Sequence, residues 1–198
     1  MKSKQFWILY VMQGMSILFC YYVVNVYKEF GEEIPTLDND KYLTLVNSIS
    51  AIFNALRFVW SGAIDKFPFR YIYGLLLLIE ISIASTMYFS KDTKETYMLV
   101  ICLVLFCVGG HFALFPNILR QIYGKQATQL YGWCFTATGI ASILIEILIV
   151  SSIGSNYMLM FALTGSGSVV AFLLLIFVFN QKRFQPNWVL IFRDYSES

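Results

Sequence analysis

Long apolar runs separated by short polar segments dominate the chain. Each run has about 20 residues, the length that an α-helix needs to cross a lipid bilayer. The runs are continuous rather than alternating, so they predict helices and not the strands of a membrane barrel. We therefore expect an all-α, multi-pass membrane protein with six transmembrane helices, over residues 6–27, 42–64, 71–89, 97–115, 130–151 and 156–180.

The composition agrees with this pattern. Hydrophobic residues make up 58% of the chain and charged residues only 13%, whereas soluble domains carry about 25% charged residues. The net charge of +2 gives no reason to expect a nucleic-acid partner. We find no phosphate-binding glycine loop and no nucleophile–base–acid set. The sequence therefore predicts neither an enzyme nor a bound cofactor. It predicts that the lipid bilayer is the main surrounding of the chain.

The charged residues between the runs predict the topology. Lysine and arginine prevail near the N-terminus, around residues 65–70 and 120–125, and after residue 180. Acidic residues prevail in the segments 28–41 and 91–95. By the positive-inside rule, both termini should lie on the cytoplasmic side, or on the matrix side of a mitochondrion. We expect the mitochondrial inner membrane, because large membrane assemblies are common there.

Three ionisable residues fall at matching depths inside the predicted spans. At a rise of about 1.5 Å per residue, Arg57, Glu80 and His111 each lie about 12–15 Å from the basic side. Such a layer near the midplane is where transporters bind substrate. The alternative is structural: Arg57 and Glu80 form a buried ion pair, and His111 is a neutral imidazole with one hydrogen bond. Glu146 lies nearer the acidic side and should be protonated or hydrogen-bonded to a neighbouring helix.

The four cysteines also fall inside the predicted spans. Their spacing matches no metal-binding motif and implies no disulfide framework. We therefore interpret them as buried thiols that pack like small hydrophobic residues, and we predict no metal site from them. They are Cys20, Cys102, Cys107 and Cys134.

Two stretches combine helix-ending residues with charges. The first is NALRFVWSGAIDKF, at residues 54–67. The second is FPNILRQIYGK, at residues 115–125, where Pro116 and Gly124 should break the helices. In this order, and with TATGIA at 136–141, they resemble the eighth-to-ninth and tenth-to-eleventh helix regions of major facilitator superfamily transporters. The second stretch is similar to the branch of the oxalate:formate antiporter and the monocarboxylate transporters.

This resemblance implies a bundle like the C-terminal half of such a transporter, with a carboxylate site. In that branch an arginine of the eighth helix and a lysine of the eleventh are associated with the substrate. Arg57 falls at the arginine position, but Thr138 falls at the lysine position, so only one cation is left. A single guanidinium suits one carboxylate group. With His111, these residues are the substrate-binding candidates.

Two further predictions concern helix ends and assembly. Asp65 and Arg70 suit a latch in which a carboxylate and a guanidinium bridge helix termini. Facilitator transporters work by rocking two six-helix halves, so a half-length chain should be an accessory or structural subunit of an assembly with other integral membrane subunits. The alternative is half of a two-part or homodimeric carrier for a small mono- or dicarboxylate. We expect the tail, residues 181–198, to contact the membrane surface or that assembly through residues 184–192.

Overall fold

The computed structural model describes residues 4–150 and 156–179, and all the regular elements in these ranges are helical. The predicted all-α, multi-pass class is therefore confirmed. The predicted tail lies outside the described residues. The elements are α1 (Lys4–Glu32), α2 (Asp40–Ala55), α3 (Phe58–Lys66), α4 (Phe69–Thr86), the 3-10 helix η1 (Met87–Asp92), α5 (Lys94–Tyr123), the 3-10 turn η2 (Gly124–Gln126), α6 (Ala127–Val150) and α7 (Tyr157–Phe177).

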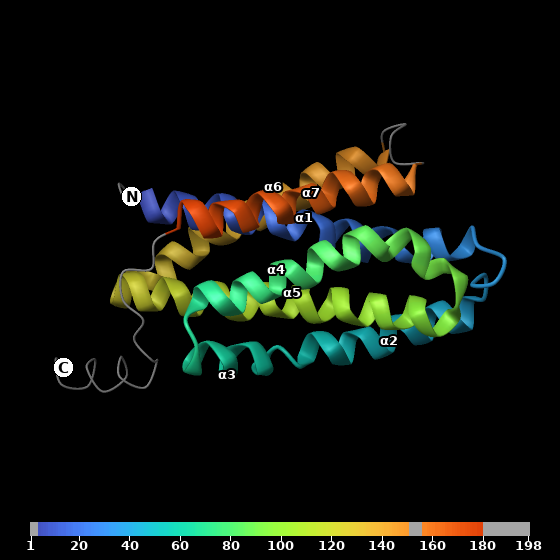
Figure 1. The fold of residues 1–198 in the computed structure, drawn as a ribbon, viewed down its shortest axis with the longest axis horizontal. Helices are drawn as coiled ribbons and strands as arrows, with labels where there is room; N and C mark the ends of the chain where they lie inside the picture. The colour runs from blue at the N-terminus through green and yellow to red at the C-terminus, as the bar shows by residue number, and fades with distance from the viewer. Residues whose placement is uncertain (1–3, 151–155, 180–198) are drawn as a thin grey trace.

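Five helical segments are long and apolar enough to cross a membrane, and one of them, Lys94–Val150, has 57 residues. A straight helix of that length would extend about 85 Å, far more than the bilayer core of about 30 Å. The segment reverses at Gly124, whose φ of 55° suits a residue without a Cβ atom. Figure 1 shows its two arms, α5 and α6, running in opposite directions, and each arm is long enough to cross by itself. Counted in this way, the described residues contain six candidate crossings. The start of α1 and the end of α7 lie at the same end of the bundle (Figure 1).

The core of the bundle is built around α1 and α5. Helix α1 packs against α5, α6 and α7, and α5 also packs against α2, α3 and α4. Large side chains such as Tyr22, Tyr73 and Tyr97 are fully buried between them. By contrast, α2, α3 and α6 leave large apolar side chains exposed, among them Ile52, Phe58, Val59, Phe135, Ile143 and Ile147. These helices present surfaces for lipid or for another protein.

The second predicted span is not one helix. Helix α2 ends at Ala55 and α3 begins at Phe58, with Leu56 and Arg57 between them. The break packs closely on α5, where a Cβ atom at Gly109 would lie 2.8 Å from the Asn54 carbonyl oxygen. The Trp60 Nε1 atom donates to the Phe106 carbonyl oxygen at 3.0 Å and ties α3 to the same helix. Close packing against α5 accompanies this break, whereas residues 54–58 around it include neither proline nor glycine.

The prediction that Pro116 ends a helix is wrong. Helix α5 continues through Pro116 to Tyr123 and ends at Gly124. Proline at 116 removes the backbone donor that would bond to the Phe112 carbonyl oxygen. In the next register of the same turn, the Asn117 Nδ2 atom donates to the Ala113 carbonyl oxygen at 2.8 Å. Membrane helices tolerate a proline in their interior more readily than soluble ones.

Candidate functional site

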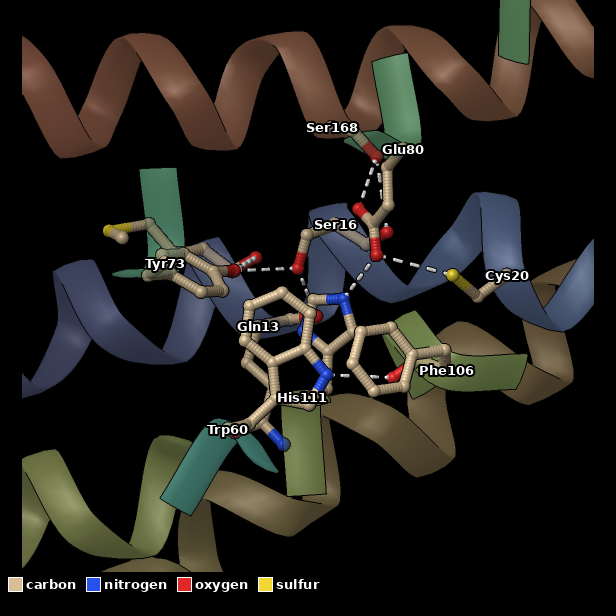
Figure 2. Close-up of polar contacts among 10 residues, drawn as sticks. Gln13, Ser16, Cys20, Trp60, Tyr73, Glu80, Phe106, His111 and Ser168 are labelled. Atoms are coloured by element: carbon tan, nitrogen blue, oxygen red, sulfur yellow. Dashed lines mark hydrogen bonds and ion pairs between the residues drawn. The ribbon is translucent and has the colours of Figure 1, made fainter. Parts of the chain in front are cut away.

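A buried carboxyl group lies where four helices meet (Figure 2). Glu80, on α4, has its Oε1 atom 2.6 Å from the Nε2 atom of His111 on α5. The Cys20 thiol on α1 donates to the same oxygen at 3.2 Å, and the Ser168 hydroxyl on α7 donates to Oε2 at 3.0 Å. All four side chains are 0% exposed. We call these four residues the Glu80 cluster.

The cluster removes most of the cost of placing Glu80 in the core. A carboxyl group in the bilayer interior is expensive unless it is paired or hydrogen-bonded. Here both oxygens have partners, and these partners come from three other helices. The ring of His111 uses only Nε2, because Nδ1 is buried without a hydrogen-bond partner among the described residues. The cluster therefore joins α1, α4, α5 and α7 through one carboxyl group.

A second set of hydrogen bonds extends the cluster along α1. The hydroxyl groups of Ser16 and Tyr73 lie 2.8 Å apart, and Tyr73 also donates to the Met12 carbonyl oxygen at 3.4 Å. Ser168 contacts the Ser16 carbonyl oxygen at 3.3 Å, so its hydroxyl reaches both α1 and Glu80. Figure 2 shows these side chains converging between α1, α4 and α7.

A glycine brings Ser168 this close to α1. A Cβ atom at Gly167 would lie only 2.3 Å from the Met15 carbonyl oxygen, so the backbones of α7 and α1 meet there. Small residues permit such an approach between membrane helices. The approach places the neighbouring Ser168 within reach of Glu80.

The structure does not form the predicted ion pair between Arg57 and Glu80. Glu80 binds His111 instead, and Arg57 is exposed at the break between α2 and α3. The Arg57 Cβ position is 3.1 Å from a Cβ atom built at Gly109. Its guanidinium interacts electrostatically with Tyr131 on α6. Arg57 is therefore not part of the Glu80 cluster.

Thr138 and His111 are both buried. Thr138, 2% exposed, accepts a hydrogen bond from the Gln13 side chain at 3.1 Å. The Gln13 oxygen accepts in turn from the Cys134 thiol at 2.8 Å, and this network links α1 to α6. A cleft of about 280 Å³ lies beside it, lined by Tyr21, Val24, Asn25, Phe135, Thr138, Gly139 and Ser142.

The helix-end latch has a different acceptor from the one predicted. Arg70 was expected to bridge to Asp65, but its Nη2 atom donates to the Ile176 carbonyl oxygen at 2.7 Å. It thus joins the start of α4 to the end of α7, while Asp65 lies near the end of α3. The hydrogen bond to a neighbouring helix expected for Glu146 is present, since Asn25 Nδ2 on α1 donates to its Oε1 atom at 3.2 Å.

Sequence reasoning missed the polar face of α1. Gln13, Ser16 and Cys20 follow the spacing i, i+3 and i+7, which places side chains on one face of a helix. All three are buried, and each forms a hydrogen bond with a side chain of another helix. The partners are Thr138, Tyr73 and Glu80, respectively. Their spacing in a membrane helix was the signal that could have predicted a buried polar site. All four cysteines are free and buried, as expected.

No protein-family model matches the chain. The chain is 25% identical over 144 residues to the uncharacterized MFS-type transporter YhjX of Escherichia coli (strain K12), which covers 72% of this chain and 36% of that protein. It is also 25% identical over 132 residues to apicoplast pyruvate carrier 1 of Toxoplasma gondii, which covers 65% of this chain and 24% of the carrier. The matched regions thus span about 24–36% of the length of these relatives.

These similarities indicate a transporter-like or carrier-like membrane protein. Both relatives are a transporter or a carrier, and neither is an enzyme. Neither is named an oxalate:formate antiporter or a monocarboxylate transporter, so the similarity supports the transporter class but not that branch.

Proposed function

We propose that this chain forms one wall of a carrier for small carboxylates and that Arg57 binds the carboxylate group. The observation that carries the proposal is the position of Arg57, an exposed cation at a helix break inside a membrane-spanning segment. A guanidinium is too costly to leave against lipid, so it should face water, protein or an anion. Interrupted helices at membrane depth are a recurring feature of transporter binding sites.

The local backbone supports an anion at this position. Arg57 occupies the N-cap of α3 and makes no side-chain hydrogen bond to the helix that follows. A helix N-terminus carries a partial positive charge and orphan N–H groups, both of which favour a carboxylate. The planar guanidinium adds two parallel donors for the two carboxylate oxygens. Arg57 and the start of α3 therefore attract the same charged group.

The surroundings of Arg57 favour a monocarboxylate. Thr138 supplies no charge, and its hydroxyl is already bonded to Gln13. His111 is bonded to Glu80 inside the bundle. We therefore propose that Thr138 and His111 hold helices together while Arg57 alone binds the anion. The name of the Toxoplasma gondii relative, a pyruvate carrier, favours the same substrate class, because pyruvate carries one carboxylate group.

Alternating access needs a second wall. We propose that another helix bundle covers the exposed apolar face of α2, α3 and α6, which includes Ile52, Phe58 and Ile143. We propose that the chain lies in an organellar membrane with both termini on the cytoplasmic or matrix side. That this membrane is the mitochondrial inner membrane stays a prediction.

The second candidate function is an accessory subunit without transport. It is favoured by the burial of Glu80 and His111, which removes two ionisable groups from any substrate path.

The test is uptake of radiolabelled pyruvate into liposomes that contain the purified protein with its native partners. A charge-assisted hydrogen bond contributes about 1.5–3 kcal/mol, so Arg57→Gln should raise the KM for pyruvate about 10- to 100-fold. Arg57→Lys should be intermediate, because it keeps the charge but loses the fork. The control is Lys66→Gln, which removes an exposed cation from the other end of α3.

Three outcomes separate the candidates. A specific effect of Arg57→Gln with normal uptake by Lys66→Gln supports the carrier. Uptake that is absent in every preparation, together with co-purification in a larger complex, supports the accessory subunit. If Arg57→Gln changes neither uptake nor assembly in a protein that transports pyruvate, the proposed role of Arg57 is wrong.

A further inference from the structure

The Glu80 cluster brings together three different metal-ligating atoms. The Cys20 Sγ atom on α1, a Glu80 carboxylate oxygen on α4 and a His111 ring nitrogen on α5 all lie within 4.8 Å of one another. Each side chain is fully buried, and the three lie 60 and 31 residues apart along the chain. Figure 2 shows Cys20 and His111 directed at the same Glu80 oxygen from different helices.

We propose that Cys20, Glu80 and His111 supply three ligands to a divalent transition metal, with zinc as the best match. Sulfur, imidazole nitrogen and carboxylate oxygen are the three ligand types that zinc accepts in proteins. Magnesium and calcium select oxygen ligands and would leave the thiol and the imidazole unused. The mixed ligand set therefore distinguishes this site from one for a hard cation.

The charge of the occupied site suits a buried position. A thiolate and a carboxylate together neutralise the two positive charges of the metal, and the imidazole binds as a neutral ligand. Starting from a thiol, a carboxylate and a neutral imidazole, binding releases the thiol proton, and the ring proton resides on Nδ1. No hydrogen bond among the described residues fixes Nδ1, so the ring can adopt the tautomer whose Nε2 lone pair faces the metal.

The distances require only a small rearrangement. Ligand atoms about 2.0–2.3 Å from a tetrahedral zinc ion lie about 3.3–3.7 Å from one another. The Cys20–Glu80 contact of 3.2 Å is already close to this range, and the His111–Glu80 contact of 2.6 Å must open by less than about 1 Å. The third pair, the Cys20 Sγ atom and a His111 ring nitrogen, lies within 4.8 Å and must close by at most about 1.5 Å. The Ser168 hydroxyl holds the other carboxylate oxygen at 3.0 Å. Ligating carboxylates commonly have such a supporting hydrogen bond.

A metal at this position would join α1, α4 and α5, the helices that surround it. The proposal does not depend on transport, because no residue of the site is exposed to a substrate. Cys107 and Tyr73 are also buried near Glu80 but are not among the three converging groups. Burial near Glu80 is therefore not enough to place a side chain among these three ligand atoms.

The test is the metal content of the full chain, produced without a polyhistidine tag in zinc-supplied cells and purified without chelators. We expect about one zinc per chain by mass spectrometry of the elements. Cys20→Ala and His111→Gln should lose most of it, whereas the control Cys134→Ala, which also removes a buried thiol, should keep it. Cobalt exchanged into the wild type should give the visible bands of a tetrahedral ion and a near-ultraviolet thiolate charge-transfer band, both absent in Cys20→Ala.

A second measurement uses only the wild type, in case the variants fold poorly. Removing zinc with a chelator should lower the melting temperature, and zinc but not magnesium should restore it. A folded wild type that contains no zinc and gives no cobalt bands overturns the proposal and leaves the cluster as a hydrogen-bonded junction. Zinc retained at the same level by Cys20→Ala and His111→Gln also overturns it, because the ion would then be bound elsewhere.

Discussion

Replacing Gly167 by alanine should destabilise the bundle strongly. A Cβ atom at Gly167 would lie 2.3 Å from the Met15 carbonyl oxygen, whereas ordinary contacts of such an atom begin at 3.4 Å. The acceptor belongs to the backbone of α1, so no side-chain rotation relieves the clash. Helices α1 and α7 must separate by about 1 Å, the difference between these two distances.

The expected magnitude follows from two losses. Inserting a methyl group into a packed core costs about 1–3 kcal/mol. Separating the helices also weakens the contacts of the Ser168 hydroxyl with the Ser16 carbonyl oxygen and with Glu80. The hydroxyl has one proton, which these two acceptors share, so we count one hydrogen bond of about 0.5–1.5 kcal/mol. Gly167→Ala should therefore cost about 1.5–4.5 kcal/mol in the free energy of unfolding.

The assay is reversible unfolding in mixed micelles, with two companion variants. Ser168→Ala removes the hydrogen bonds without the clash and should cost less than Gly167→Ala. Gly139→Ala is the matched control, since Gly139 lies in α6 with nothing within 4 Å of its built Cβ atom. This control should be neutral or should stabilise by about 0.4–1 kcal/mol. Equal stabilities for Gly167→Ala and Gly139→Ala would refute the close approach of α1 and α7.

Three other predictions test the site and the topology. Glu80→Leu should cost at least about 1–3 kcal/mol in the free energy of unfolding, because it leaves buried polar groups of Cys20, His111 and Ser168 without their partner. The double variant Glu80→Leu/His111→Phe should cost less than the sum of the two single variants, and strict additivity in the same unfolding assay would contradict their coupling. Gly109→Ala should lower the free energy of unfolding by about 1–3 kcal/mol and reduce pyruvate uptake, because its Cβ atom would press on Asn54 and Arg57. The control Gly132→Ala should change neither, because nothing lies within 4 Å of a Cβ atom built there. Cysteines introduced at the exposed positions Asp38 and Lys125 should be labelled from opposite sides of the membrane, and labelling of both from one side would refute the six-crossing topology.

The apolar runs and residue counts were enough to predict the class of the protein, one of its turns and the depth of several side chains in the membrane. Continuous apolar runs are a property of composition, and only helices satisfy their backbone groups in lipid. Gly124 likewise marked the turn between α5 and α6, because a positive φ favours glycine. Counting residues along a helix also placed Glu80 and His111 at similar depths, and the structure brings them together.

Which of the ionisable side chains at that depth contact one another depends on how the helices pack. Depth fixes a position along the helix axis but not the direction in which a side chain leaves the helix, and therefore Arg57 and His111 were equally available to Glu80. The direction depends on how the helices cross, and the crossings depend on close contacts such as those at Gly109 and Gly167. The contact at Gly109 also accompanies the break of α2 from α3 at Arg57, although residues 54–58 include neither glycine nor proline. Packing between helices distant in sequence thus separated an exposed cation from a buried carboxyl cluster, and no local pattern encodes that choice.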